Sequence, residues 1–497
     1  MRLPFARFAR EKIAGNGGVA PSSIMVPRVL FLASSLGILI FGLLMIYSSS
    51  SIMGLTSSNY GNDPAYFVVR QLEFAAVGVV FALVLACLDY HTWQGNMLTI
   101  VSVITVMLLV IVFAPIAGRD AYGATRWIAI GPFTLQPSEF AKVSVLLAGA
   151  KFAESYLWER TLSNKEALVI GVVGVIVPLG LVLLQPDKGT TGVVVMTLIV
   201  MCYLAGVRGQ VIVSAGCVFA ILVFCVSVSD EYSRARIATM FDPANDPFGA
   251  GYQLMQGFYA FGTGGLTGLG LGMSRQKYNY LPMAHNDFIY AVIGEEMGLV
   301  GTIGLLAAFA LLLWSGFKIA EAAPDMAGRL IAAGCTSLFI IQLLLNVGGV
   351  LGMLPLTGKP VPFVSYGGSS IISSMMLVGL VTSVSLRSTL PETSYEERRS
   401  RMRLTPQDSA ATHLERDGSY VGRIQNEGGM PVMSSPLAGS GIKRFRVVEG
   451  GRSQKDSTSS TYGVAPYRRL DLGPSPRERL RADEKDLSKR AARRTHE

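Results

Sequence analysis

The stretch KYNYLPMAHNDFIYAVIGEE, residues 277–296, passes directly from a polar, glycine-rich loop into an apolar helix. Asp287 lies at the junction, where aspartate is a favoured N-cap because its carboxylate accepts the free amides of the first turn. Glu295 and Glu296 follow inside the apolar run. Acids inside a membrane are costly and indicate a functional site. The alternative is structural: Asp287 only caps the helix, and one glutamate bonds to a neighbouring helix.

The composition on both sides of this stretch is that of a polytopic membrane protein. Of 497 residues, 50% are hydrophobic and only 15% are charged, and soluble chains of this length carry more charge. Apolar runs of about 20 residues, the length of a membrane-spanning helix, recur along the chain. We therefore predict an all-α fold of ten spans: 29–49, 67–88, 96–116, 137–156, 168–184, 190–206, 210–228, 287–314, 329–351 and 369–387.

Charge distribution predicts the orientation and three parts of the chain. Residues 1–28 are polar and basic, so by the positive-inside rule they are cytoplasmic, and ten spans return the other end to the same side. Residues 29–387 form the membrane domain, with one large external loop at 229–286. From Arg387 onward there are 22 Lys and Arg against 15 Asp and Glu. Residues 388–497 lack apolar runs, which predicts a mostly disordered, basic cytoplasmic tail.

Two kinds of site are disfavoured by the sequence. The five cysteines all lie inside apolar runs, and neither they nor the four histidines show metal-ligand spacing, so we expect no disulfide. The run GTGGLTGLGLG, residues 262–272, lacks the preceding strand and the following Lys-Ser/Thr of a phosphate-binding loop. We interpret it as a flexible or re-entrant loop in which glycine permits close backbone approach.

Five motifs at the expected outer side resemble one family. They are GATRWI (123–128), QPSEFAK (136–142), QPDKGT (185–190), YLP-AH-DFIYAVIGEE (280–296) and PVPFVSYGGSS (360–370). Together they resemble the SEDS family of bacterial peptidoglycan glycosyltransferases over residues 29–387. The segments YSSSS and NDFIYAVIGEEMGLVG resemble the cell-division members of the family more than the elongation members. The chain departs from the family pattern at Lys188, usually apolar, and at Asn286, usually Thr or Ser.

The resemblance implies polymerisation of lipid II at the outer face of the bacterial cytoplasmic membrane, with undecaprenyl pyrophosphate as the leaving group. It also implies a class B penicillin-binding protein, other cell-division proteins and membrane lipids as partners, a place at the division septum, and no nucleic acid. No cofactor is required by the sequence, although a divalent cation, Mg²⁺ or Mn²⁺, bridging the pyrophosphate is left open. Two alternatives are a lipid II flippase and a non-catalytic scaffold for cell division.

Asp287 matches the family's essential aspartate and is our candidate catalytic base. As an N-cap near positive charge it should have a lowered pKa, whereas partial burial would raise that pKa. The candidate substrate-binding residues are Arg126, Trp127, Glu139, Lys142, Asp187, Arg234, Arg236, Lys277, His285, Ser365, Gly367, Gly368 and Ser369.

Each substrate-binding candidate also has a structural interpretation. Cations in the large loop can anchor to lipid headgroups, and Trp127 can be a plain interfacial aromatic residue. Glu139 and Lys142 are three residues apart, the spacing of an ion pair on one helix face. Asp187 can cap the helix that follows it, and the glycines of the last motif suit a tight turn.

Overall fold

The computed structural model describes residues 22–114, 118–121, 124–130, 133–158, 163–229, 231–246 and 248–388. The expected tail from residue 389 and the segment before residue 22 lie outside the described residues. The described part is mostly helical, which confirms the predicted fold class. Its α-helices are α1 (Ser22–Thr56), α2 (Tyr66–Cys87), α3 (Asn96–Ile111), α4 (Pro137–Phe152), α5 (Asn164–Gly171), α6 (Val177–Leu184), α7 (Lys188–Leu204), α8 (Gly209–Ser229), α9 (Glu231–Phe241), α10 (Ala250–Gly264), α11 (Ile289–Glu321), α12 (Met326–Val350) and α13 (Gly368–Arg387).

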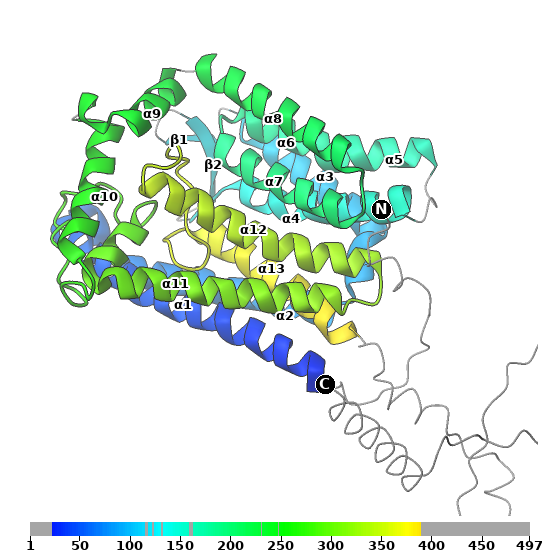
Figure 1. The fold of residues 1–497 in the computed structure, drawn as a ribbon, viewed down its shortest axis with the longest axis horizontal. Coiled ribbons are helices and arrows are strands. Elements are labelled where there is room, and N and C mark those ends of the chain that lie inside the picture. Colours follow the sequence, from blue (N-terminus) through cyan, green and yellow to red (C-terminus); the bar gives the residue numbers. More distant parts are fainter. Residues whose placement is uncertain are drawn as a thin grey trace, which may run out of the picture. The chain divides into compact units, whose positions relative to one another are not determined.

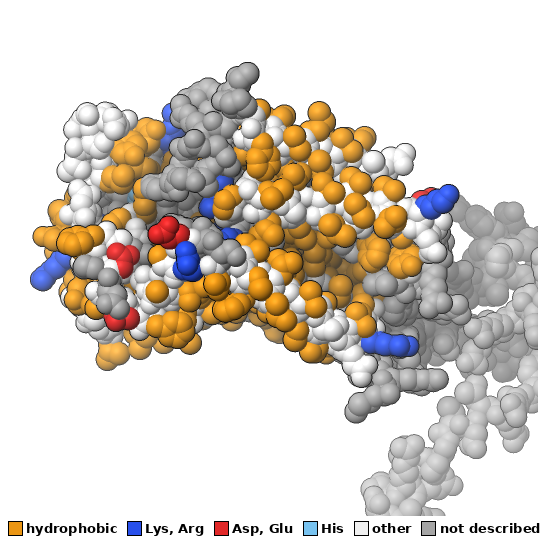
Figure 2. Space-filling model, turned by 90° about the horizontal axis from the view of Figure 1, so that it is seen from above, with side chains coloured by type: hydrophobic (Ala, Val, Ile, Leu, Met, Phe, Trp, Pro, Cys, Tyr) orange, Lys and Arg blue, Asp and Glu red, His pale blue; other side chains and the backbone are white. Residues whose placement is uncertain are grey.

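Among the described residues, seven helices are long and apolar enough to cross a membrane. One of them, Asn164–Leu184, joins α5 and α6 through the π-helical turn Val172–Ile176. Two further apolar helices, α3 and α7, are shorter, and α4 has 16 residues. The protein is thus a multi-pass membrane protein, while the count of ten crossings stays a prediction. Figure 2 shows hydrophobic side chains over the middle of the molecule and charged ones near its two ends.

Helix α1 is longer than predicted at both ends. It begins at Ser22 instead of residue 29 and runs through the serine run to Thr56. Within the serine run, hydroxyls find acceptors one turn earlier in the helix: Ser50 Oγ donates to Ile46 O at 2.6 Å. Such bonds satisfy a hydroxyl within an apolar helix. The predicted external loop at 50–66 is therefore shorter, and its first residues belong to α1.

Helices α12 and α13 form the centre of the bundle, because most of their residues are buried. Helix α13 packs along α2, and α11 packs along both α1 and α12. By contrast, no residue in the apolar span of α8 is fully buried, and only one face of this helix is half-buried. Figure 1 shows these helices running side by side, with α9, α10, β1 and β2 together at one end.

A small antiparallel sheet follows α3, which the prediction of an all-helical chain did not include. Its strands are β1 (Gly118–Ala121), β2 (Ala124–Ile130) and β3 (Phe133–Leu135), in the order β1-β2-β3. Thr125, Trp127 and Ile128 are residue types that favour a pleated strand. Residues 124–128 of the GATRWI motif thus lie on β2, and β3 leads from there to the QPSEFAK motif that opens α4.

The large loop expected at 229–286 is substantially helical, since it contains α9 and α10. Its glycine run then packs against a break in α11 at Gly298, where φ is +65°. A Cβ on Gly268 would lie 2.2 Å from the carbonyl oxygen of Glu296, so the expected close backbone approach is confirmed. The run supplies the hydrogen bonds that the break removes: Leu269 N donates to Glu295 O, and Leu299 N donates to Gly265 O, both at 3.0 Å.

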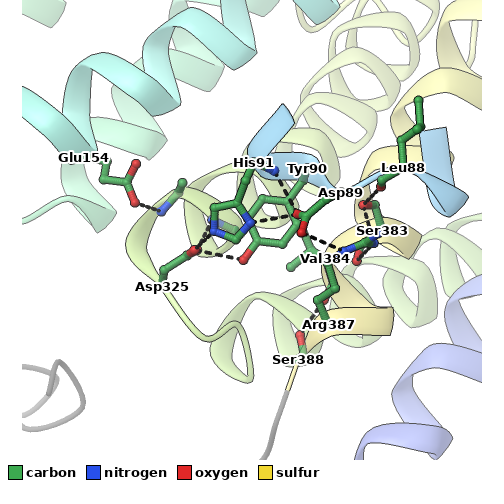
Figure 3. Close-up of polar contacts among 12 residues, drawn as sticks. Leu88, Asp89, Tyr90, His91, Glu154, Asp325, Ser383, Val384, Arg387 and Ser388 are labelled. Atoms are coloured by element: carbon green, nitrogen blue, oxygen red, sulfur yellow. Dashed lines mark hydrogen bonds and ion pairs between the residues drawn. The ribbon is translucent and has the colours of Figure 1, made fainter. Parts of the chain in front are cut away.

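A polar cluster joins three elements at the opposite end of the bundle (Figure 3). The His91 ring lies between two carboxylates, with Nδ1 2.7 Å from Asp89 and Nε2 2.5 Å from Asp325. Arg387, at the end of α13, is 3.3 Å from Asp89. Asp325 also caps α12 through the amide of Gly328. The short helix Tyr90–Gln94 is thereby tied to both α12 and α13.

Candidate functional site

Asp287 does not cap α11, so that prediction is wrong. The N-cap position is Phe288, and no side chain caps the helix there. The carboxylate of Asp287 lies instead at Gly358, where a Cβ would be 3.4 Å from Asp287 Oδ2 and 3.6 Å from Arg236 Nη1. The acid and the guanidinium therefore meet at the same glycine. Arg236, from a distant part of the chain, lies at the same glycine, and local helix chemistry does not reveal such a partner.

The electrostatic environment of Asp287 combines burial with two cations. Burial raises the pKa of the Asp287 carboxyl, the positive charges of Arg236 and Lys359 lower it, and the net pKa is raised. Of the two opposing influences expected from the sequence, burial is the larger. A carboxylate with a raised pKa binds a proton more readily, which is what a general base needs.

Asn346 of α12 ties the Asp287 segment to the loop that precedes α13. Its Nδ2 donates to Asp287 O at 2.9 Å and to Lys359 O at 2.7 Å. The two backbone carbonyls are therefore bridged by one buried amide. This bridge fixes the start of α11 relative to Lys359, although the two segments are far apart in the sequence.

Asp187 is the centre of a buried network beside this bridge. Its Oδ1 is 2.6 Å from Lys359 Nζ, and its Oδ2 accepts from Ser138 Oγ at 2.8 Å and from Gln136 Nε2 at 3.2 Å. The carboxylate also accepts from Thr190 N, so the capping interpretation of Asp187 at α7 is confirmed. Burial alone would raise the pKa of Asp187, but Lys359 and Arg126 hold it well below its usual range. Asp187 is thus a fixed anion.

Arg126 of β2 lies against the same loop. Its Nε and Nη2 donate to the carbonyls of Gln185 and Pro186 at 3.0 and 2.7 Å. Lys188, the departure from the family pattern, points to α9 instead, where its Nζ donates to Ser233 Oγ at 2.6 Å. Both cations therefore hold the QPDKGT loop between the sheet and α9.

Glu139 and Lys142 form the ion pair that their spacing predicts. The two groups are 2.6 Å apart, and both side chains are almost fully buried. Ser373 of α13 donates to Glu139, and Lys142 donates to Gln342 of α12, both at 3.0 Å. The pair therefore joins three central helices, as the structural interpretation expected.

The PVPFVSYGGSS motif builds the turn that leads into α13. Ser365 Oγ accepts from Val361 N at 2.8 Å, and Ser369 Oγ accepts from Gln136 N at 2.9 Å. Gly367 N donates to Gln71, and a Cβ on Gly368 would lie 2.6 Å from the Phe74 ring. These residues hold α13 against α2 and α4, which places the motif at the site's edge.

Four candidates do not join the Asp287 site through the contacts observed. Lys277 is buried against Gly272 O and 3.6 Å from Glu296, which itself accepts from Ser48 of α1. The His285 ring packs against Phe67 and Tyr366, and burial lowers its pKa to about 4. It is therefore neutral near pH 7 and supplies no positive charge. Arg234 is exposed and Trp127 is half-buried.

Sequence reasoning missed Lys359, Gln136, Ser138 and Thr190 as members of the site. Lys359 was the only charged residue in the loop LPLTGKPVPFVSYGGSS, and that isolation was a usable signal. The three neutral residues lie within quoted motifs. However, polar residues of this kind carry no chemical signature until their partners are known.

Among the described residues, no group of three His, Cys, Asp or Glu is arranged to hold a metal ion. The acids at the site already face cations: Lys359 binds Asp187, and Arg236 and Lys359 act on Asp287. These donors do not suit a resident divalent ion. A cation bridging the pyrophosphate of a substrate stays a prediction.

Fold and site together define a multi-pass helical membrane protein with a buried acid–cation centre at one end of its bundle. A family model described as "Cell cycle protein" matches residues 28–390. The chain belongs to this family, which comprises FtsW, RodA and SpoVE.

Two relatives and two solved structures illustrate the likeness. The chain is 38% identical over 361 residues to stage V sporulation protein E of Bacillus subtilis, covering 72% of this chain and 97% of that protein. It is 40% identical over 345 residues to the "Probable peptidoglycan glycosyltransferase FtsW" of Trichlorobacter lovleyi, covering 69% and 89%. RodA of Thermus thermophilus aligns with a TM-score of 0.53, 26% identity and coverage of 73% and 97%. A chain of a peptidoglycan synthase complex aligns with a TM-score of 0.55, 28% identity and coverage of 72% and 96%.

Proposed function

We propose that this chain is a peptidoglycan glycosyltransferase that polymerises lipid II at the outer face of the cytoplasmic membrane, for septal synthesis in cell division. The observation that carries the proposal is the buried Asp287 carboxylate, with its raised pKa, beside Arg236. Relatives named as peptidoglycan glycosyltransferases support the substrate class. The septal role rests on the relatives named FtsW.

In the proposed reaction, a sugar hydroxyl of one strand attacks the anomeric carbon of a lipid-linked donor. Asp287 takes the hydroxyl proton as the new C–O bond forms. The bond from the anomeric carbon to the pyrophosphate oxygen breaks, and undecaprenyl pyrophosphate leaves with the electron pair. Guanidinium groups pair well with phosphate oxygens, so Arg236 and Arg126 are the cations that would meet this developing charge.

Partner binding is part of the same proposal. A solved relative belongs to a synthase complex that coordinates polymerisation and crosslinking. We therefore propose a class B penicillin-binding protein as the crosslinking partner, with other cell-division proteins around it. Polymerisation of lipid II should therefore be measured both with and without that partner.

The test is polymerisation of labelled lipid II by purified full-length protein, with chain length read on gels. Wild-type protein should produce glycan strands, and Asp287→Asn should reduce the rate by about 10²–10⁴-fold, the usual worth of a positioned base. Asn keeps the size of the side chain, so a folded variant isolates the lost charge. Near-normal strands from Asp287→Asn would reject the base, and transport of lipid II across vesicles without polymerisation would favour a flippase.

A further inference from the structure

Lys359 occupies a confined position in the loop before α13. Its Nζ is 2.6 Å from Asp187 Oδ1 and donates to Thr190 Oγ1 at 2.5 Å, while its side chain is only 6% exposed. The preceding residue, Gly358, lies beside the Asp287 carboxylate, since a Cβ there would be 3.4 Å from Asp287 Oδ2. One buried ammonium group therefore neutralises Asp187 and also acts electrostatically on Asp287.

The chain leaves room for this lysine at one specific place. A Cβ on Gly189 would lie 2.8 Å from Lys359 Cε and 2.9 Å from Cγ. Any side chain at residue 189 would collide with the lysine stem. The stem therefore passes close to the backbone of α7 at Gly189.

The backbone of Lys359 is held as firmly as its side chain. Asn346 donates to the carbonyls of both Lys359 and Asp287, at 2.7 and 2.9 Å. The ammonium is fixed at Asp187 and Thr190, while the carbonyl is fixed beside Asp287. Movement of Lys359 would consequently disturb both aspartates.

We propose that Lys359 is a positioning residue for the transfer: held by Asp187, Thr190 and Asn346, it keeps Asp287 negatively charged and correctly placed as the proton acceptor. This inference rests on the proposed role of Asp287. Lys359 is buried and already bonded, so it acts through Asp287 and does not contact the substrate.

The charged and titratable groups around Asp287 come from several elements. Arg236 approaches from α9 and Lys359 from the loop before α13, and Asp187 at α7 acts through its bond to Lys359. His285 lies on the same segment as Asp287, but its ring is turned to Phe67. Burial by itself favours the protonated acid, which cannot accept a proton. Without Lys359, Arg236 alone would oppose that effect.

The first experiment titrates Asp287 directly by infrared spectroscopy of purified full-length protein. The carbonyl band of protonated Asp287 is identified by its loss in Asp287→Asn. In Lys359→Met, the titration midpoint should rise by about one pH unit or more, the effect of removing a nearby opposite charge. Lys277→Met is the matched control, because it also removes a buried ammonium from an acid but in the Glu296 cluster, and it should leave the Asp287 midpoint unchanged.

The second experiment separates this role from simple neutralisation of Asp187. Asp187→Asn combined with Lys359→Met removes the whole ion pair, and Asn retains a cap for α7. Thermal stability should recover in the double variant relative to Lys359→Met, but the Asp287 midpoint should stay raised. The acid side of the pH–rate profile for lipid II polymerisation should shift by the same amount in both variants.

An unchanged Asp287 midpoint in Lys359→Met would overturn the proposal, as would a double variant that recovers the wild-type midpoint and pH profile together with its stability. If Lys359→Met does not fold, the double variant carries the same measurement. If wild-type protein does not polymerise lipid II, the proposed function fails, while the infrared titration still decides whether Lys359 controls the charge on Asp287.

Discussion

At the scale of single residues, Gly358 lies beside both the acid and its cation. Gly358 has φ +65°, a conformation that side chains rarely adopt, and a Cβ there would be in ordinary van der Waals contact with both Asp287 and Arg236. Arg236 Nη1 also donates to Leu356 O at 2.5 Å, two residues earlier in the same loop. A left-handed backbone of this kind is costly for residues other than glycine. A change at Gly358 should therefore disturb the loop that carries Leu356 and lies beside Asp287.

Gly358→Ala should therefore lower both stability and activity. The left-handed backbone alone should cost about 1–3 kcal/mol of folding free energy, measured by thermal unfolding. Polymerisation should fall further than in Gly37→Ala, whose Cβ would meet nothing within 4 Å. Equal activity in the two variants would show that the Gly358 loop does not control Asp287.

At the scale of elements, the His91 cluster fixes the short helix Tyr90–Gln94 to α12 and α13 (Figure 3). Burial lowers the pKa of His91, but hydrogen bonds and charges from Asp89 and Asp325 outweigh it, and the net pKa is raised from 6.5. For Asp89, burial has the opposite effect and raises the pKa. Its hydrogen bonds to His91 and the charges of His91 and Arg387 outweigh burial, so the net pKa of Asp89 is below 3.8. Both groups are therefore charged in the folded state between pH 3.8 and 6.5.

The resulting stability should depend on pH in a defined direction. The His91 contribution is complete below its ordinary pKa of 6.5 and is lost as pH rises through the raised folded value. The Asp89 contribution is present above 3.8 and is lost as pH falls through its lowered value. The melting temperature of His91→Gln should therefore fall furthest below that of the wild type between pH 3.8 and 6.5. The difference between the two melting temperatures should narrow at alkaline pH. Lys318→Met, at the exposed pair with Glu321, should show no such profile.

At the scale of the whole molecule, topology determines which end meets the lipid-linked substrate. Phe248 is 96% exposed in the segment between α9 and α10. Phe248→Cys in a background without the native cysteines should react with an impermeant maleimide in intact cells. Labelling only after permeabilisation would reverse the proposed orientation.

The chain beyond residue 389 is expected to be dispensable for the transfer. Its composition cannot bury a core, and the family match ends at residue 390. Truncation after Leu390 should keep lipid II polymerisation within a few-fold of the full chain. A truncated protein that folds and inserts but loses activity would make the tail part of the enzyme.

Sequence reasoning predicted those features that depend on near neighbours or on long composition trends. The apolar runs predicted helices, the spacing of Glu139 and Lys142 predicted their pair, and Asp187 caps the helix that follows it. It could not reveal features that depend on distant partners. Asp287 does not cap its helix and lies at Gly358 beside Arg236, and Lys277 Nζ lies 3.6 Å from Glu296.

The break in α11 at Gly298 makes the glycine run a segment of fixed length. Residues 265–270 exchange backbone hydrogen bonds with Glu295, Glu296, Leu299 and Val300, so a deletion or insertion there shifts every bond at once. The side chains of Leu266, Leu269 and Leu271 are exposed, so packing does not require leucine at these positions. We therefore expect the spacing of these glycines to be more tightly constrained than the identity of the residues between them. Peptide tags should be accepted near Phe248 and refused between Gly265 and Gly270.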